Sequence, residues 1–121
     1  MIVWNIRGLN KAAKFREFGS RLSELNVSII ALLETRVKKD KMDRVRQRLG
    51  RKWRYLDNYD DHENGRIWIL WDDHKVYVRL VDSSDQFMHC GIYDMALSYS
   101  MNYFRLCAQQ FGSTKRTVAS Y

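Results

Sequence analysis

The sequence predicts an α/β fold (α+β by its sheet arrangement), with a mixed sheet that carries two helices on one face. Three segments at the start of the 121-residue chain support this prediction. Residues 2–5 form a short apolar strand pattern, residues 12–25 repeat apolar side chains at helical spacing, and residues 27–33 form an apolar run that does not alternate. A run of that kind is typical of a strand buried on both faces. A strand–helix–strand unit has a right-handed crossover, so the two strands are expected to be parallel.

The first predicted helix has one apolar stripe, with charged residues on its other side. The stripe consists of residues spaced three or four apart: Ala12, Phe15, Phe18, Leu22 and Leu25. This spacing places them on one face of a helix, which then packs on the sheet. Asn10 is a suitable N-cap, and Asn26 is suited to end the helix in the left-handed conformation.

The second predicted helix covers residues 39–49 and ends at Gly50. Met42, Val45 and Leu49 share its inward face. Further along the chain, residues 53–55 alternate as in a strand and residues 57–65 form a polar loop. Residues 66–71 and 76–81 are expected to pair as a hairpin through residues 72–75. Residues 87–93 and 103–108 are weaker strand candidates.

Two polar residues follow the predicted parallel strands. Asn5 ends the first strand and Glu34 follows the second. Functional groups gather at the carboxyl ends of strands in parallel sheets, so the two are expected at the same edge. Taken alone, such an asparagine is usually a turn residue and such a glutamate a surface carboxylate. Their assignment to a site therefore depends on further motifs.

The net charge of +7 is concentrated in residues 36–54, where ten basic residues face two acidic ones and give +8. The rest of the chain carries −1. A dense basic segment favours contact with a polyanion, and a solvated helix face is the alternative. The residues expected to bind nucleic acid, without sequence preference, are Arg36, Lys38, Lys39, Lys41, Arg44, Arg48, Arg51 and Lys52.

Composition excludes several other classes of protein. No apolar run approaches the ~20 residues of a membrane span, and no signal peptide precedes the first strand. Cys90 and Cys107 lack the CxxC spacing of a zinc ribbon, and the three histidines lack metal-ligand spacing. We therefore expect an intracellular protein with no membrane partner, which is nuclear if it acts on DNA.

Three segments in order resemble the endonuclease/exonuclease/phosphatase superfamily. They are residues 4–10 (WNIRGLN), residues 33–36 (LETR) and residues 64–71 (NGRIWILW). With residues 86–90 (QFMHC) added, the chain most resembles the endonuclease domain of plant LINE-type (non-LTR) retrotransposons. Each motif is weak alone, but their order and spacing across residues 1–90 are quite specific.

The resemblance implies a four-layer α/β sandwich, of which this chain would be the N-terminal half, and Mg²⁺-dependent hydrolysis of DNA phosphodiesters. It makes Asn5 and Glu34 the catalytic positions and Glu34 the metal ligand. Magnesium prefers carboxylate oxygens and water in octahedral geometry, which suits a glutamate beside a substrate phosphate. The metal polarises the phosphoryl oxygen and stabilises the leaving oxygen.

The sequence departs from the family in three places. Arg7 stands where many members have an acidic residue, and Cys107 and Gln110 stand where a tyrosine and an asparagine are expected. The later Asp-x-Asn and Ser-Asp-His motifs, which supply the general base and a transition-state donor, are missing. We therefore expect one truncated domain over residues 1–121, with residues 91–121 diverged.

Such a chain is expected to be inactive alone. It is also expected to leave a sheet face uncovered, through which it could self-associate. Two alternatives to the endonuclease fragment stay open. One is a non-enzymatic nucleic-acid-binding remnant, and the other is a decayed reading frame without a selected function.

Overall fold

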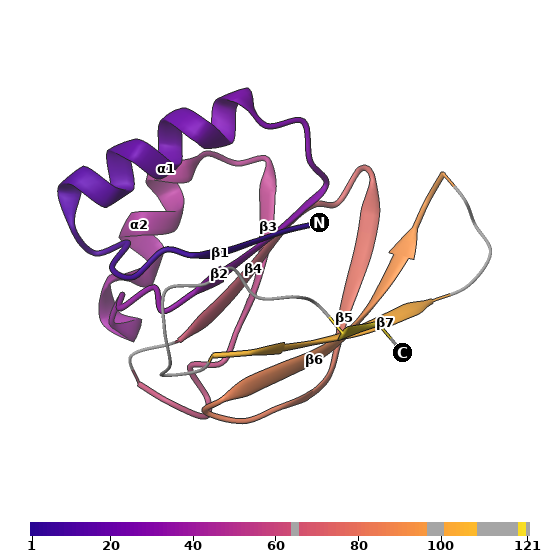
Figure 1. Ribbon diagram of the computed structural model, residues 1–121. Helices are drawn as coiled ribbons and strands as arrows, with labels where there is room; N and C mark the ends of the chain where they lie inside the picture. Colours follow the sequence, from indigo (N-terminus) through magenta and orange to yellow (C-terminus); the bar gives the residue numbers. More distant parts are fainter. Residues whose placement is uncertain (64–65, 97–100, 109–118, 121) are drawn as a thin grey trace.

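The computed structural model describes residues 1–63, 66–96 and 101–108, together with the backbone of residues 119–120. It has an α+β fold with two helices, a mixed sheet and an antiparallel sheet. The elements form three layers, with the helices on one side of the mixed sheet and the antiparallel sheet on the other (Figure 1). The predicted α+β class is therefore confirmed.

The mixed sheet has the strand order β1-β2-β4-β3. β1 (Ile2–Asn5) runs parallel to β2 (Ile29–Leu33), which confirms the predicted strand–helix–strand unit. β4 (Ile67–Asp72) pairs antiparallel with both β2 and β3 (Trp53–Asp57). Every residue of β2 and of β4 is buried, as expected for strands covered on both faces.

Two helices cover one face of this sheet. α1 (Ala12–Glu24) connects β1 to β2 along the chain, and α2 (Met42–Leu49) follows the short 3₁₀ helix η1 (Lys39–Lys41). The core of this layer includes Phe15, Phe18, Leu22, Ile30, Leu32, Trp53, Trp68 and Leu70. Full burial of a side chain such as Phe18 contributes about 1.5–3 kcal/mol to folding. The inward face predicted for α2 is confirmed, since Met42, Val45 and Leu49 pack against this core.

The predicted caps of α1 are wrong. Its N-cap is Lys11, one residue after Asn10, and the Lys11 carbonyl accepts a hydrogen bond from the Phe15 amide. At the other end, Leu25 already has extended backbone angles, φ −82° and ψ 127°. The chain thus leaves the helix without a left-handed residue at Asn26. The predicted stop of α2 is confirmed at Gly50, whose φ of +98° suits glycine.

The second sheet is antiparallel and contains β5 (Val76–Ser83), β6 (Phe87–Asp94) and β7 (Asn102–Cys107). The two-residue strand β8 (Ala119–Ser120) pairs with β7. One face of this sheet packs on the mixed sheet. The shared core includes Val3, Ala31, Leu33, Ile67, Ile69, Trp71, Val78, Met88, Cys90, Phe104 and Leu106.

The predicted hairpin of residues 66–71 and 76–81 is wrong. Residues 72–75 do form a tight connection, but β4 and β5 belong to different sheets. Their burial gives the physical reason. β4 is buried along its whole length, whereas exposed residues interrupt the buried ones in β5. β4 is apolar on both faces and belongs in the central sheet, which is buried on both faces. β5 is apolar on one face and belongs in a sheet with one solvent-exposed face.

The two sheets are partners of each other, and self-association through an uncovered sheet face stays a prediction. The two sheets cover each other, and the helices cover the far face of the mixed sheet. The face over which no described helix lies is the outer face of the antiparallel sheet (Figure 1). Within the described residues, no helix has the length and apolar character that crossing a membrane requires.

Candidate functional site

Asn5 and Glu34 lie at the same edge of the mixed sheet. Asn5 is the last residue of β1 and pairs with Leu33, and Glu34 follows Leu33 directly. The residue after Asn5 continues the pairing, because the Ile6 amide donates to the Leu33 carbonyl at 3.1 Å. We call this end of the sheet, with Asn5, Glu34 and the loop after Glu34, the Glu34 edge.

The backbone at Glu34 is held in the left-handed conformation, with φ +56°. Its amide donates to the Arg66 carbonyl at 2.6 Å, and its carbonyl accepts from the Gly8 amide at 3.0 Å. Arg7 and Arg36 also have positive φ, +47° and +57°. Each such residue costs about 1–2 kcal/mol relative to right-handed backbone. Conformations of this kind concentrate at functional sites, where the surrounding structure maintains them.

The Glu34 carboxylate lies between two guanidinium groups. Its Oε2 is 3.7 Å from Arg7 Nε and 3.9 Å from Arg36 Nη2. These distances are those of ion pairs and exceed hydrogen-bond lengths. Close by in the sheet, the buried Oδ1 of Asn5 has no hydrogen-bond partner. The Glu34 edge thus combines one carboxylate, one unsatisfied amide oxygen and two cations.

Tyr59 fixes the loop that follows Glu34. Its hydroxyl donates to the Val37 carbonyl at 2.5 Å and accepts from Trp68 Nε1 at 3.1 Å. Burial raises the pKa of Tyr59 to about 12, so the phenol keeps its proton at neutral pH. The sequence prediction placed Tyr59 in a polar loop and missed this role. An aromatic residue among polar ones was the only signal.

Asn58 joins the two sheets beside the same edge and was also missed. It is 1% exposed. Its side-chain nitrogen donates to the Ser84 carbonyl at 3.2 Å, and its Oδ1 accepts from the Ile67 amide at 3.0 Å. Buried polar groups that are fully hydrogen-bonded specify one arrangement of their neighbours. Asn58 therefore helps to set the position of the antiparallel sheet relative to β4.

Four of the ten cations in residues 36–54 have carboxylate partners. Their pairs are Arg36 with Glu34 at 3.9 Å, Arg46 with Asp57 at 2.7 Å, Lys52 with Asp72 at 3.8 Å and Arg54 with Asp73 at 2.8 Å. Within the described part of the chain, no carboxylate lies within 4.0 Å of the other six, which are all exposed. These six are Lys38, Lys39, Lys41, Arg44, Arg48 and Arg51.

Arg46 is a structural cation. Its guanidinium lies over the rings of Tyr55 and Trp68, at 4.5 and 4.7 Å from their centroids, and bonds the Asp57 carboxylate. A stacked and paired guanidinium of this kind holds α2 against the sheet. These contacts occupy the guanidinium, so Arg46 is not counted among the cations available to a phosphate.

The basic segment runs from one edge of the mixed sheet to the other. Lys38 and Lys39 follow closely on Glu34, whereas Lys52 precedes Trp53, which pairs with Asp72 at the far end of β4. Asp72 in turn follows Trp71, the partner of the first residue of β2. The candidate phosphate-binding cations thus lie before, along and after α2, and Arg36 is the one that lies beside Glu34.

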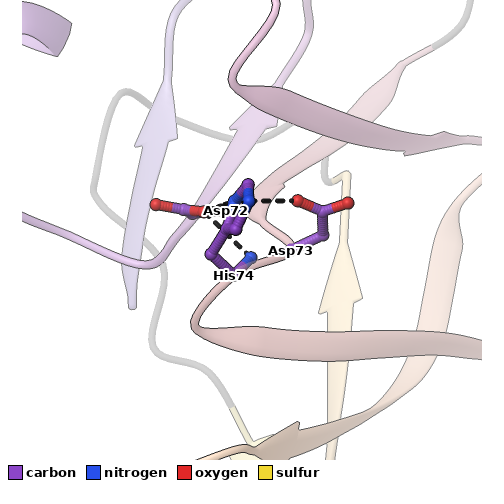
Figure 2. A group of neighbouring side chains, drawn as sticks. All are labelled: Asp72, Asp73 and His74. Atoms are coloured by element: carbon purple, nitrogen blue, oxygen red, sulfur yellow. Dashed lines mark hydrogen bonds and ion pairs between the residues drawn. The ribbon is translucent and has the colours of Figure 1, made fainter.

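A second group of polar side chains lies at that far end, which we call the Asp72 edge (residues 72–75). Asp72, Asp73 and His74 place ligand-type atoms within 4.8 Å of one another (Figure 2). The Asp72 Oδ1 accepts from the His74 amide at 3.0 Å, and His74 Nδ1 lies 3.3 Å from each carboxylate. These contacts are those of an Asx-type turn. They account for the cluster without a metal.

The Asp72 carboxyl has a lowered pKa. The hydrogen bond from the His74 backbone is the largest cause, and Lys52 adds a Coulombic contribution. Asp72 is thus a turn-stabilising carboxylate, and the far end of the sheet gives no reason to assign it chemistry.

Comparison with protein-family models, with curated proteins and with solved structures finds no match for this chain. Three positions of the predicted motifs lie outside the described residues: residues 64–65 of the third motif, and Gln110. Cys107, at the expected tyrosine position, is partly exposed at the end of β7.

Proposed function

We propose that this chain is the N-terminal half of a four-layer endonuclease/exonuclease/phosphatase-like domain, of the kind found in plant LINE-type retrotransposons. It binds DNA without sequence preference and does not cleave DNA by itself. The observation that carries the proposal is the parallel pairing of β1 and β2, which brings the last residue of β1, Asn5, beside the Leu33–Glu34 step. The two family-derived positions thus share one edge.

Magnesium fits the oxygen atoms at this edge in part. Glu34 would supply the carboxylate ligand, and the buried Asn5 Oδ1, which lacks a partner, could face a metal-bound water or a phosphate. When bound, Mg²⁺ supplies charge stabilisation at the phosphoryl and leaving oxygens. Arg7 and Arg36 beside Glu34 weaken attraction for a dication but favour an anionic phosphate.

The same residues explain why cleavage is not expected from these 121 residues. Asn5 and Glu34 can orient a phosphate and help to hold a metal, and the resemblance assigns neither of them the role of general base. Loss of a general base costs ~10²–10⁴ in rate, and loss of one donor at the developing charge costs about 10²–10³. These losses are not additive, but either one brings hydrolysis close to background.

A nicking assay on supercoiled plasmid tests the catalytic part. With Mg²⁺, the wild-type chain and Glu34→Gln should nick equally little. Mg²⁺-dependent nicking that disappears in Glu34→Gln would overturn the statement that the chain is inactive alone. It would also place the metal at Glu34.

Thermal unfolding tests the metal part without activity. Mg²⁺ that binds only the folded chain raises its melting temperature, by mass action. We expect a rise with MgCl₂ that Glu34→Gln lacks and that Glu24→Gln, an exposed glutamate of α1, retains. NaCl at equal ionic strength should not reproduce it. An equal rise in all three proteins would contradict a metal role for Glu34.

A non-enzymatic nucleic-acid-binding protein is the second candidate function. The six exposed cations without a carboxylate partner favour it, because such charges are available to phosphates. A chain that shows the Glu34-dependent Mg²⁺ stabilisation but binds no DNA would argue against this candidate and against the DNA-binding part of the first one. Only the metal part of the first proposal would then stand.

A further inference from the structure

The outer face of the antiparallel sheet is rich in aromatic side chains. Side chains alternate between the two faces of a strand, and Val78, Met88, Cys90, Phe104 and Leu106 point to the core. Their neighbours therefore point outward. The outward-facing residues are Tyr77 and Arg79 on β5, Phe87, His89, Gly91 and Tyr93 on β6, and Tyr103, Arg105 and Cys107 on β7.

The register of the three strands brings these side chains together in pairs. Tyr77 lies opposite Tyr93, and His89 lies opposite Arg105. The Arg105 guanidinium lies over the Phe87 ring at 4.4 Å from its centroid. The face thus has four phenyl or phenol rings and a histidine on neighbouring strands, with an arginine stacked on one ring.

Gly91 lies at the centre of this face. A Cβ at this position would come within 2.7 Å of the Met101 side chain and 3.2 Å of the Tyr103 ring. The Met101 and Tyr103 side chains therefore occupy the space above Gly91, where another residue would have its side chain. The centre of the face is consequently apolar and has no side chain projecting from Gly91.

Exposure and charge indicate what this face can bind. Tyr77 is 51% exposed, Arg79 and Arg105 are exposed, and Phe87, Tyr93 and Tyr103 are partly exposed. Asp82, opposite His89, is the one carboxylate that the register places on this face among the described residues, against the two arginines. Aromatic rings with guanidinium groups between them suit a ligand with flat bases and a phosphate backbone.

We propose that this face binds single-stranded DNA, whose unpaired bases stack on the tyrosines while its phosphates contact Arg79 and Arg105. The choice of DNA over RNA rests on the function proposed above. The face is separate from the basic segment, because the mixed sheet lies between the antiparallel sheet and the helices (Figure 1). A duplex does not fit the proposal, since its bases are stacked inside and cannot reach a sheet face.

Fluorescence anisotropy with a labelled oligo-dT strand and a duplex of equal length tests the proposal on the full chain. Tyr77→Ala and Tyr103→Ala should each weaken single-strand binding by about tenfold, the usual size of one base–aromatic contact. Tyr77→Phe and Tyr103→Phe keep the rings and should retain affinity. All four should leave duplex binding unchanged.

The matched control removes charge from the other surface. The double variant Lys39→Ala and Lys41→Ala should weaken duplex binding and leave the effect of the tyrosine variants on the single strand as large as before. This comparison distinguishes loss of single-strand binding at the sheet face from loss of duplex binding at the basic segment. The nicking and Mg²⁺ experiments test the proposed function without using either oligonucleotide.

Several outcomes would overturn the inference. They include alanine variants that lose duplex and single-strand binding equally, and phenylalanine variants as weak as the alanine ones. Tighter binding of oligo-U than of oligo-dT would overturn the choice of DNA. If the wild-type chain binds no single strand but forms a dimer that Tyr77→Ala dissociates, the face is an interface between copies of this chain.

Discussion

The two edges of the mixed sheet both carry carboxylates, but they use them differently. At the Asp72 edge, the Asp72 carboxylate is 7% exposed, accepts from the backbone of its own turn and has a lysine nearby. At the Glu34 edge, the carboxylate is 22% exposed and meets two guanidinium groups at ion-pair distance, on backbone that glutamate rarely adopts. The hydrogen bond and the nearby lysine make Asp72 a residue that stabilises the fold. Glu34 has an unfavourable left-handed backbone, and its long ion pairs do not offset the free energy that this conformation costs.

The comparison teaches which carboxylate to test for function. Three close ligand-type atoms at the Asp72 edge suggest a metal by proximity alone. Hydrogen bonding accounts for them, because the turn needs an acceptor at Asp72. Glu34 has no such structural reason, and its strained backbone directs attention to ligand binding.

Salt dependence gives the largest expected effect and separates the cations of the two edges. If the six cations without a carboxylate partner meet duplex phosphates, log K against log salt has a slope near −5, about −0.9 for each contact. Lys39→Ala with Lys41→Ala should reduce the slope by about 2. Arg54→Ala, at the Asp72 edge and paired with Asp73 at 2.8 Å, should leave it unchanged. Filter-binding titrations measure this, and a flat salt dependence would remove the basic segment from any binding role.

Stability should respond at the Asp72 edge. Asp72→Ala removes the acceptor for the His74 amide and should lower the free energy of unfolding, measured by urea denaturation, more than Asp73→Ala does. Asp73→Ala, at the more exposed neighbour, should cost less than about 1 kcal/mol. Equal effects of the two changes would contradict the distinction between the buried and the exposed carboxylate.

The lowered pKa of Asp72 also predicts how the stability of the fold changes at acid pH. The lowered pKa of Asp72 means that its ionised form stabilises the fold above the ordinary value of 3.8. This contribution disappears as the pH falls from there through the lower pKa of the folded state. The stability difference between the wild-type chain and Asp72→Asn should therefore shrink below that pH. A difference that stays constant from neutral to acid pH would show that Asp72 is not ionised in its turn.

The smallest effect is expected at Glu34. Glu34→Gly relieves the left-handed backbone and should raise the free energy of unfolding by up to about 1 kcal/mol. Glu34→Gln keeps the backbone strain and should change it by less than about 0.5 kcal/mol, since its ion pairs are long and partly exposed. Thermal melts decide between them. A strong loss of stability in both variants would make Glu34 a structural residue and remove the contrast between the edges.

The periodicity of the sequence was enough to predict the strand–helix–strand unit and the second helix. Residues such as Phe15, Phe18 and Leu22 can share one face only in a helix, and the apolar run of β2 leaves little alternative to a buried strand. The common edge for Asn5 and Glu34 followed from topology alone, because parallel neighbouring strands end at the same side.

Long-range choices were harder to predict. A good turn lies between residues 66–71 and 76–81, so the local sequence favoured a hairpin. β4 is apolar on both faces and must be buried on both, and β5 lies in the other sheet. The unbroken apolar pattern of β4 beside the alternating one of β5 was the signal for this. The roles of Tyr59 and Asn58 depend on partners 22 and 26 residues away. No local pattern reveals such contacts.

β4 belongs to both cores at once. Ile67, Ile69 and Trp71 face the antiparallel sheet, and Trp68 and Leu70 face the helices. If either the helices or the antiparallel sheet unfolded alone, one face of β4 would be exposed to solvent. The helices and the antiparallel sheet should therefore unfold together in a single transition. The amide protons of β4, bonded to β2 on one side and β3 on the other, should then exchange with solvent only when the whole domain opens.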